Sequence, residues 1–382
     1  MNKDLKNMII IFWGFFCLSL FSNTLSPFIT TIKSIYGVSD NIIVLLPSVV
    51  YCSSFIMSIA ASKFMHMLKL KRGLYISFLL VIFSSIVILL SKSFYILLFG
   101  YFLSGLALGM GGLFLGTLIS LLPKKYQKFG FANACFGIGG ILILPIDRLV
   151  LRNGISFNYT YIIHIVLMAV LIVLSTGLSG ISLPKDNLKH RNSLHILKNP
   201  MVLILSIAVF FYVGAEISTT NWTGSFLERD YGINKGEVPD ILFGFWILFT
   251  LGRAFGDKLL ENIGQLKFLL ISPIASIAGI FVILLGTEKL QALIGLSIIG
   301  ISISLIYPAL QGYIIQHVSF ENIPSASSVI VIFNNLGAAF LTYIIGFAGG
   351  KNITYVFIIQ IAFFAYIAFS ALHYVSFKPQ RN

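Results

Sequence analysis

One acidic residue, Glu216, lies inside a stretch that otherwise has the composition of a membrane helix. Tyr212, Glu216, Thr219 and Thr223 recur at helical spacing, so they form one polar face on the segment 210–228. A carboxylate at bilayer depth is costly unless it is protonated, paired or hydrated, and such residues commonly serve a function. Three interpretations stay open: Glu216 binds and releases a proton, pairs with a neighbouring helix as a structural group, or hydrogen-bonds a solute directly.

Three of the other charged residues within, or at the end of, predicted membrane helices are candidates for a gate. Arg253 and Asp257 stand one helical turn apart, where they would form either a gating latch or a solvated surface pair. Asp147 lies about 27 Å along its helix from Phe129 at 1.5 Å per residue, which places it near the outer mouth. It shares a helix face with Asn133. We therefore predict a role for Asp147 in an outer gate, with a helix-end carboxylate as the plainer alternative.

Aromatic and amide side chains on several predicted spans would suit a sugar-like solute. Rings stack on the apolar faces of a pyranose, while amides satisfy its hydroxyl groups. The same residue types also form interfacial belts and join helices, so each has a structural alternative. The predicted substrate-binding or proton-binding residues are Glu216, Tyr212, Asn221, Trp222, Asn23, Asn133, Tyr307, Gln311, Asn334 and Asn335.

The composition indicates which elements carry these residues. The 382 residues are 57% hydrophobic and only 10% charged, too few charges for a soluble surface. Apolar runs of about 20 residues recur along the whole chain, each long enough to cross a bilayer. We predict an all-α polytopic membrane protein with twelve transmembrane helices, at residues 8–31, 42–65, 73–90, 94–122, 129–151, 159–183, 200–227, 239–260, 268–285, 290–317, 324–347 and 354–376.

The predicted spans divide into two groups of six. Residues 1–183 form the N-terminal bundle, residues 184–199 a polar, basic cytoplasmic linker, and residues 200–382 the C-terminal bundle. The first span repeats the polar spacing found around Glu216, with Ser19, Asn23, Ser26 and Thr30. This repetition supports two parallel halves, an arrangement that binds substrate between the halves near the bilayer midplane.

The net charge of +13 is explained by orientation in the membrane and not by nucleic acid binding. Lys and Arg gather in loops on one side, chiefly in 69–72, 124–128 and 185–198. The positive-inside rule then places both termini in the cytoplasm. The first apolar run has no small-x-small cleavage site, so we interpret that run as a span and not as a signal peptide.

Short sequence motifs lie within several predicted spans and at the ends of others. The segment 252–264 carries Gly, Arg and Asp after the eighth span, whereas the matching first-half segment 61–72 keeps a basic end without the glycines or the aspartate. Segment 252–264 resembles the loop motif of the major facilitator superfamily of secondary transporters, and the span count and central linker extend this resemblance over essentially the whole chain. Similarity to the fucose-permease-like sugar transporters of that family lies in the motifs at 212–216, 221–222, 133–140 and 333–337. The resemblance implies two six-helix halves and a gating role for the second-half loop.

These features predict a secondary active transporter. We expect it to take up a small polar, sugar-like solute across a bacterial cytoplasmic membrane by alternating access coupled to protons. One alternative is a proton-antiport exporter of a drug-like or secreted metabolite, and another is a membrane sensor that has lost transport. The sequence has no nucleotide-binding loop or catalytic constellation, so we expect no enzyme activity, cofactor or metal site. The expected partners are the solute, the proton and the lipid bilayer, and we expect a monomer.

Overall fold

The computed structural model describes residues 2–43, 45–181, 193–233 and 238–376, and within these ranges every regular element is a helix. The first eight α-helices are α1 (Lys3–Asn23), α2 (Leu25–Tyr36), α3 (Asp40–Ile43), α4 (Leu45–Leu68), α5 (Leu70–Leu89), α6 (Phe94–Ser120), α7 (Phe129–Arg152) and α8 (Thr160–Ser175). The others are α9 (Pro200–Asp230), α10 (Val238–Ile263), α11 (Gln265–Leu285), α12 (Lys289–Ile303), α13 (Ile306–Gln316), α14 (Ile323–Lys351) and α15 (Tyr355–Ser376). Short 3₁₀ helices are η1 (Lys124–Tyr126), η2 (Phe157–Tyr159), η3 (Ser193–Lys198) and η4 (Phe320–Asn322).

The helices confirm the prediction of an all-α polytopic membrane protein. Over the described residues, 11 helices are long and apolar enough to cross a membrane, and each corresponds to one predicted span. The remaining predicted span, 239–260, corresponds to α10, which is not among them although it is 26 residues long. Most of the predicted linker, 184–199, lies outside the described residues, and its end forms η3.

Two of the predicted spans are each broken into two helices near a proline. Pro27 follows the break between α1 and α2, and Pro308 follows the break between α12 and α13. Proline has no N–H group and its ring clashes with the carbonyl four residues earlier, so a continuous helix is interrupted there. The break before Pro308 leaves the carbonyl of Ser304 without its usual helical partner.

The chain clusters into two compact units, each described here by itself. Unit 1 contains Met1–Lys128, Cys135–His195 and Ser319–Asn335, and unit 2 contains Phe129–Ala134, Ile196–Val318 and Leu336–Asn382. Helices α7 and α14 therefore contribute residues to both units. The predicted bundle boundaries at residues 183 and 200 stay a prediction.

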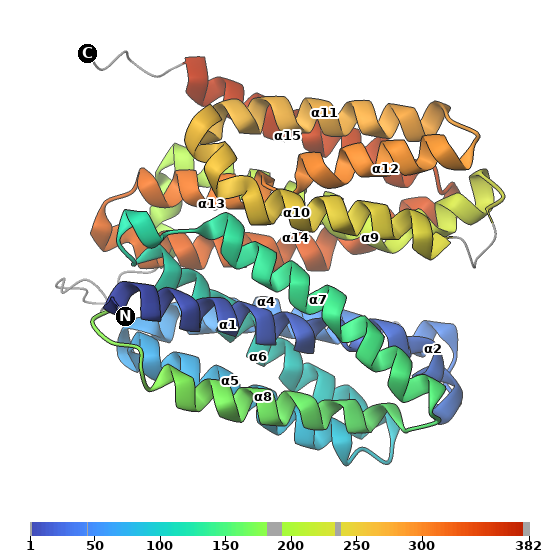
Figure 1. Ribbon diagram of the computed structural model, residues 1–382, viewed down its shortest axis with the longest axis horizontal. Coiled ribbons are helices and arrows are strands. Elements are labelled where there is room, and N and C mark those ends of the chain that lie inside the picture. The colour runs from blue at the N-terminus through green and yellow to red at the C-terminus, as the bar shows by residue number, and fades with distance from the viewer. Residues whose placement is uncertain (1, 44, 182–192, 234–237, 377–382) are drawn as a thin grey trace. The chain divides into compact units, whose positions relative to one another are not determined.

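In unit 1, α6 is the central helix, with α4 and α5 packed against it and α8 against α5 (Figure 1). Gly105 and Gly109 allow α6 to approach α4 closely. A Cβ atom at Gly105 would lie 2.2 Å from the carbonyl oxygen of Val50, and one at Gly109 would lie 2.3 Å from that of Ser54. In unit 2, α11 packs against α12 and α15, while α10 packs on α12 and α9 on α15.

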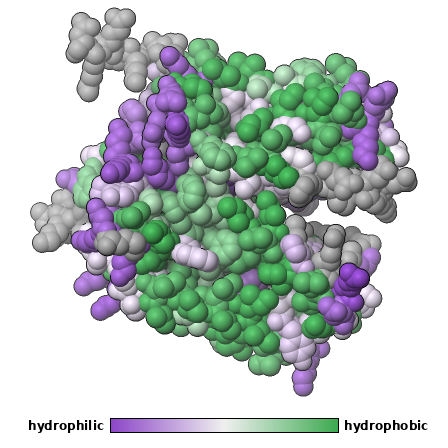
Figure 2. Space-filling model, viewed as in Figure 1, coloured by the Kyte–Doolittle hydropathy of each residue, from purple (hydrophilic) through white to green (hydrophobic). Residues whose placement is uncertain are grey.

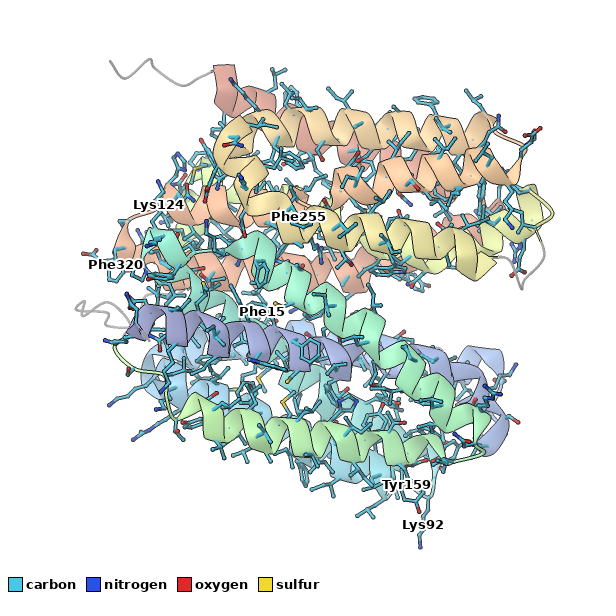
Figure 3. The ribbon with its side chains drawn as sticks, in the orientation of Figure 1. Phe15, Lys92, Lys124, Tyr159, Phe255 and Phe320 are labelled. Carbon is cyan, nitrogen blue, oxygen red and sulfur yellow. The ribbon has the colours of Figure 1, made fainter. Side chains whose placement is uncertain are left out.

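The surface of each unit matches a helical bundle in lipid. Figure 2 shows hydrophobic residues over the middle of each unit and hydrophilic residues toward its ends. Phe255, labelled in Figure 3, projects from α10 with 74% of its surface exposed. Such large exposed apolar side chains are stable where the surrounding solvent is hydrocarbon.

Candidate functional site

A buried arginine in unit 2 gathers polar groups from α9 and from the break between α12 and α13. Arg253 on α10 donates from Nη2 to Glu216 Oε1 at 3.1 Å and to Tyr212 Oη at 3.0 Å, both on α9. Its Nε donates to the carbonyl oxygen of Ser304 at 3.2 Å. We call the group formed by Tyr212, Glu216, Phe249, Arg253, Ser304 and Tyr307 the Arg253 centre. Its ion pair balances a charge that would otherwise be very costly to bury.

Local sequence explains why Arg253 reaches Ser304. The carbonyl of Ser304 lacks a helical partner because Pro308, four residues later, has no N–H group. Gly252 lets α10 approach this point, since a Cβ atom there would lie 2.2 Å from Ser304 Oγ. The helix break and the glycine together position the guanidinium.

Aromatic rings enclose the charged part of the centre. The guanidinium carbon of Arg253 lies 4.0 Å from the ring centroid of Phe249, one helical turn earlier on α10. The rings of Tyr212 and Tyr307 have centroids 6.2 Å apart. A cation held over an aromatic face and out of water gains about 2 kcal/mol. These rings therefore stabilise the charge and exclude solvent from it.

The two partners of the ion pair differ in exposure. The side chain of Arg253 is 5% exposed, whereas that of Glu216 is 21% exposed. Tyr212 is buried at 1%, and Tyr307 is half-buried. The partly exposed members of the Arg253 centre, which we call its accessible edge, are therefore Glu216 and Tyr307.

The predicted polar face of α9 divides between two environments. Tyr212 and Glu216 belong to the Arg253 centre, but Thr219 is fully buried and donates to Gln360 Oε1 on α15 at 2.9 Å. Thr223 is also fully buried and donates to the carbonyl of Thr219. The second half of the face thus joins helices within unit 2, because a buried hydroxyl needs a partner.

Asp257 stands one helical turn from Arg253, but its described hydrogen bonds are to backbone groups of α7. Its carboxylate oxygens accept from the backbone N–H groups of Gly130 and Phe131, both at 2.9 Å and both within unit 2. These N–H groups belong to the first turn of α7, where no helical acceptor exists and the helix dipole favours negative charge. Asp257 therefore caps α7, and its gating role stays a prediction.

The predicted amide residues bind mostly to nearby groups within one unit. Asn23 donates to the Ser19 carbonyl at 2.9 Å, and Asn133 donates to the Phe129 carbonyl at 2.8 Å. Asn335 donates to Ser58 within unit 1, and Asn334 contacts Asn335 at 3.5 Å. These hydrogen bonds do not test whether the amides bind a solute. The binding roles therefore stay predictions.

Three other predicted residues have distinct positions in unit 2. Asn221 is exposed and Gln311 is buried at 4%. Trp222 is half-buried and packs on α14, where a Cβ atom at Gly346 would lie 2.9 Å from the indole. In the first span, the side chains of Ser26 and Thr30 lie outside the described residues.

Asp147, in unit 1, is fully buried, and among the described residues neither of its oxygens has a hydrogen-bond partner. It differs in this respect from both Glu216 and Asp257. The structure therefore separates the predicted acidic residues into one ion pair, one helix cap and one isolated carboxyl group.

Sequence reasoning missed two members of the Arg253 centre, Ser304 and Phe249. Both had a signal in the sequence: Pro308 frees the carbonyl four residues earlier, and Phe249 precedes Arg253 by one helical turn. It also missed the pairing of Arg253 with Glu216, which depends on how two helices pack.

Comparison with known proteins identifies the family of the chain. A sequence model described as Major Facilitator Superfamily matches residues 11–342. The chain belongs to the major facilitator superfamily. It is therefore a transporter and not an enzyme.

Relatives within the major facilitator superfamily differ in their named substrates. The nitrite extrusion protein of Bacillus subtilis is 25% identical over 200 residues, which cover 51% of this chain and 50% of that relative. The probable nitrate transporter NarT of Staphylococcus epidermidis is 24% identical over 292 residues, covering 73% of each chain. The solved structure of FucP in the outward conformation matches with a TM-score of 0.82 and 18% identity, over 97% of this chain and 99% of that chain. FucP is a fucose:proton symporter of E. coli, and the likeness to it confirms the fucose-permease-like fold.

Proposed function

We propose that the chain takes up a small, neutral, polar solute of the sugar class across a bacterial cytoplasmic membrane, by alternating access driven by a proton gradient. The Arg253 centre is the proposed contact of unit 2 with the solute. The observation that carries this proposal is the partial exposure of Glu216, whose ion-pair partner Arg253 is buried.

Charge favours a neutral solute in this centre. Arg253 and Glu216 balance each other, so the pair is neutral as it stands. A solute approaching the accessible edge meets the carboxylate first. Hydroxyl groups donate well to a carboxylate, whereas an anion is repelled by it. A sugar therefore fits the exposed edge better than an anion does.

Tyr307 supplies the apolar surface that sugar binding requires. It is half-buried at the same edge as Glu216, and its ring lies near that of Tyr212. A pocket with an aromatic face and a few placed polar groups both orients a polar ligand and covers its C–H surface.

An inorganic oxyanion is the second candidate solute. It is favoured by the planar guanidinium of Arg253, which matches oxyanion geometry, and by the names of the nitrite and nitrate relatives. For the guanidinium to bind an anion, Glu216 has to accept a proton or move aside. This candidate therefore makes Glu216 a competitor of the solute, whereas the sugar proposal makes it a ligand.

Transport by purified protein in proteoliposomes tests the proposal. With an imposed pH gradient, we expect labelled monosaccharides to accumulate, and we expect a protonophore to abolish the accumulation. Accumulation of nitrate or nitrite alone would establish the second candidate instead. Extrusion of cationic dyes without sugar uptake would support an exporter, and binding without any flux would support a sensor.

The substitution Glu216→Gln separates the two solutes. If the solute is a sugar, we expect weaker binding by about tenfold or more, since a hydrogen bond to a charged group contributes about 1.5–3 kcal/mol. If the solute is an oxyanion, the same change frees Arg253 and binding stays equal or strengthens. Isothermal titration with both solute classes measures this, and Glu321→Gln on exposed η4 is the matched carboxylate-to-amide control.

We also propose that both termini face the cytoplasm and that the transporter acts as a monomer. The basic loops at 69–72 and 124–128 support this orientation. Reporter enzymes fused at the C-terminus, active only on one side of the membrane, check the orientation. A periplasmic signal from the fusion would reverse it.

A further inference from the structure

Asp147 places a buried carboxyl group in unit 1. Its residue is 0% exposed, and both Oδ1 and Oδ2 lack a hydrogen-bond partner among the described residues. An ionised carboxylate in such surroundings is very costly, and a buried group of this kind becomes neutral unless it is paired. The neutral acid, by contrast, is compatible with these surroundings.

Polar side chains of α6 and α8 form a hydrogen-bonded cluster in unit 1. The hydroxyl groups of Tyr101 on α6 and Tyr161 on α8 are 2.7 Å apart. His164, on the same helix as Tyr161, is fully buried and bonds through Nε2 to Thr24 Oγ1 at 2.8 Å.

Other titratable groups do not supply a described counter-charge. Cys17 is the titratable residue of α1 in the stretch that packs on α7. The side chain of Arg148, the next residue of α7, lies outside the described residues. The polar cluster formed by Tyr101, Tyr161 and His164 contains no lysine or arginine.

A proline interrupts the backbone hydrogen bonds of α7 next to Asp147. Pro145 lies inside α7, two residues before Asp147, and removes the helical hydrogen bond to the carbonyl of residue 141. Proline is a common cause of kinks in helices. On the N-terminal side of Pro145, α7 packs tightly on α1, where a Cβ atom at Gly139 would lie 2.6 Å from the carbonyl oxygen of Phe16. Movement at Pro145 would therefore shift Asp147 relative to a fixed part of α7.

We propose that Asp147 is the proton-carrying group of this transporter: it holds a proton while buried in unit 1 and releases it when α7 bends at Pro145 and exposes it to water. On release, the O–H bond of the acid breaks, the proton passes to water on the receiving side, and the carboxylate that remains is hydrated. Proton coupling then resides in unit 1, whereas solute contact in unit 2 involves Glu216, which is paired with Arg253. The coupling role rests on the proposed function, but the protonation of Asp147 does not.

Infrared spectroscopy of the protein in lipid nanodiscs tests the protonation directly and needs no substrate. The parent is expected to show the C=O stretch of a protonated carboxyl group near neutral pH, and this band should disappear as the pH is raised. Asp147→Asn should lack the band, while Glu216→Gln and Glu321→Gln should keep it. A band that Asp147→Asn leaves unchanged would overturn the proposal, as would a band that no accessible pH removes.

A second variant keeps the test decisive if Asp147→Asn misfolds. Asp147→Glu keeps a carboxyl group and should show a titrating band at a shifted frequency. If Asp147→Asn does not elute as a single species, the parent and Asp147→Glu spectra decide the matter: an identical band in both would contradict the assignment to Asp147.

Transport tests the coupling role separately. With whichever solute the parent carries, Asp147→Asn should lose accumulation driven by a pH gradient but retain exchange of labelled for unlabelled solute. Full gradient-driven accumulation in this variant would contradict the coupling role even if the infrared band is confirmed. If the parent carries no solute, the proposed function fails, while the infrared result still decides whether Asp147 holds a proton.

Discussion

The carboxyl groups of Glu216 and Asp147 lie in different units and are balanced in opposite ways. Glu216 has a guanidinium 3.1 Å away and is 21% exposed, whereas Asp147 is fully buried and, among the described residues, has no partner for either oxygen. A nearby cation stabilises the ionised form, and burial without one stabilises the neutral form. The same functional group is thus suited to hydrogen-bonding a solute in unit 2 and to carrying a proton in unit 1.

Asp257 lies between these extremes. It has backbone N–H groups from the first turn of α7 as donors, so its charge is stabilised by a helix end. The described partners of the three residues therefore differ: a guanidinium for Glu216, the N–H groups of a helix end for Asp257, and no described group for Asp147. This difference predicts how much each change costs.

Removing the cation from unit 2 is expected to have the largest effect. Arg253→Gln leaves Glu216 beside an uncharged amide, and breaking a buried pair in this way costs about 3–5 kcal/mol. We expect a clear fall in thermal stability and loss of transport, measured by the unfolding temperature in detergent and by uptake. Unchanged stability in Arg253→Gln would show that Glu216 does not depend on its partner and would remove the contrast with Asp147.

The double variant Arg253→Gln with Glu216→Gln sharpens this result. It removes both charges, so most of the lost stability should return, because a neutral pair has no uncompensated charge. Transport should stay absent, since the solute contact is gone. Arg253→Lys keeps the charge but loses the planar fork of N–H donors. Its unfolding temperature should therefore lie between those of the parent and Arg253→Gln.

Much of the fold was predictable because bilayer crossing imposes a simple rule on composition. Spans such as α5 and α11 match their predicted ranges within a few residues, since about 20 apolar residues are needed to cross the hydrocarbon layer. The breaks between α1 and α2 and between α12 and α13 were missed. Pro27 and Pro308 signalled them, but proline also occurs within continuous helices such as α7, so the sequence does not decide between a kink and a break.

The composition of the Arg253 centre was less predictable. Glu216 and Arg253 were both singled out from the sequence, yet Arg253 was interpreted with Asp257 because those residues share a helix face. The pairing that the structure shows joins residues 37 positions apart and depends on the packing of α9 against α10. A helical periodicity reveals which residues share a face, but it does not reveal which face of the next helix they meet.

A smaller effect is expected from Gly252→Ala, which tests how precisely the Arg253 centre is positioned. The new Cβ atom would lie 2.2 Å from Ser304 Oγ, so α10 or the Ser304 side chain has to shift. Overpacking of this kind costs about 1–3 kcal/mol. Gly350→Ala on α14 is the matched control, since nothing lies within 4 Å of its new Cβ, and we expect it to be neutral or stabilising by about 0.5–1 kcal/mol. Equal unfolding temperatures in the two variants would show that the close approach at Gly252 is not required.

The smallest effect is expected from Asp257→Asn, which converts the carboxylate at the start of α7 into a neutral amide. Asparagine can still accept from one of the Gly130 and Phe131 N–H groups, so the main loss is the interaction of a negative charge with the helix end, about 0.3–1 kcal/mol. Faster hydrogen exchange at 129–131, measured by mass spectrometry, is the expected local sign. Asp230→Asn is a suitable control, because Asp230 is the last residue of α9 and its charge opposes the dipole there. If Asp257→Asn costs as much stability as Arg253→Gln, the carboxylate of Asp257 contributes more than its interaction with the helix end, and the expected order of the two changes is wrong.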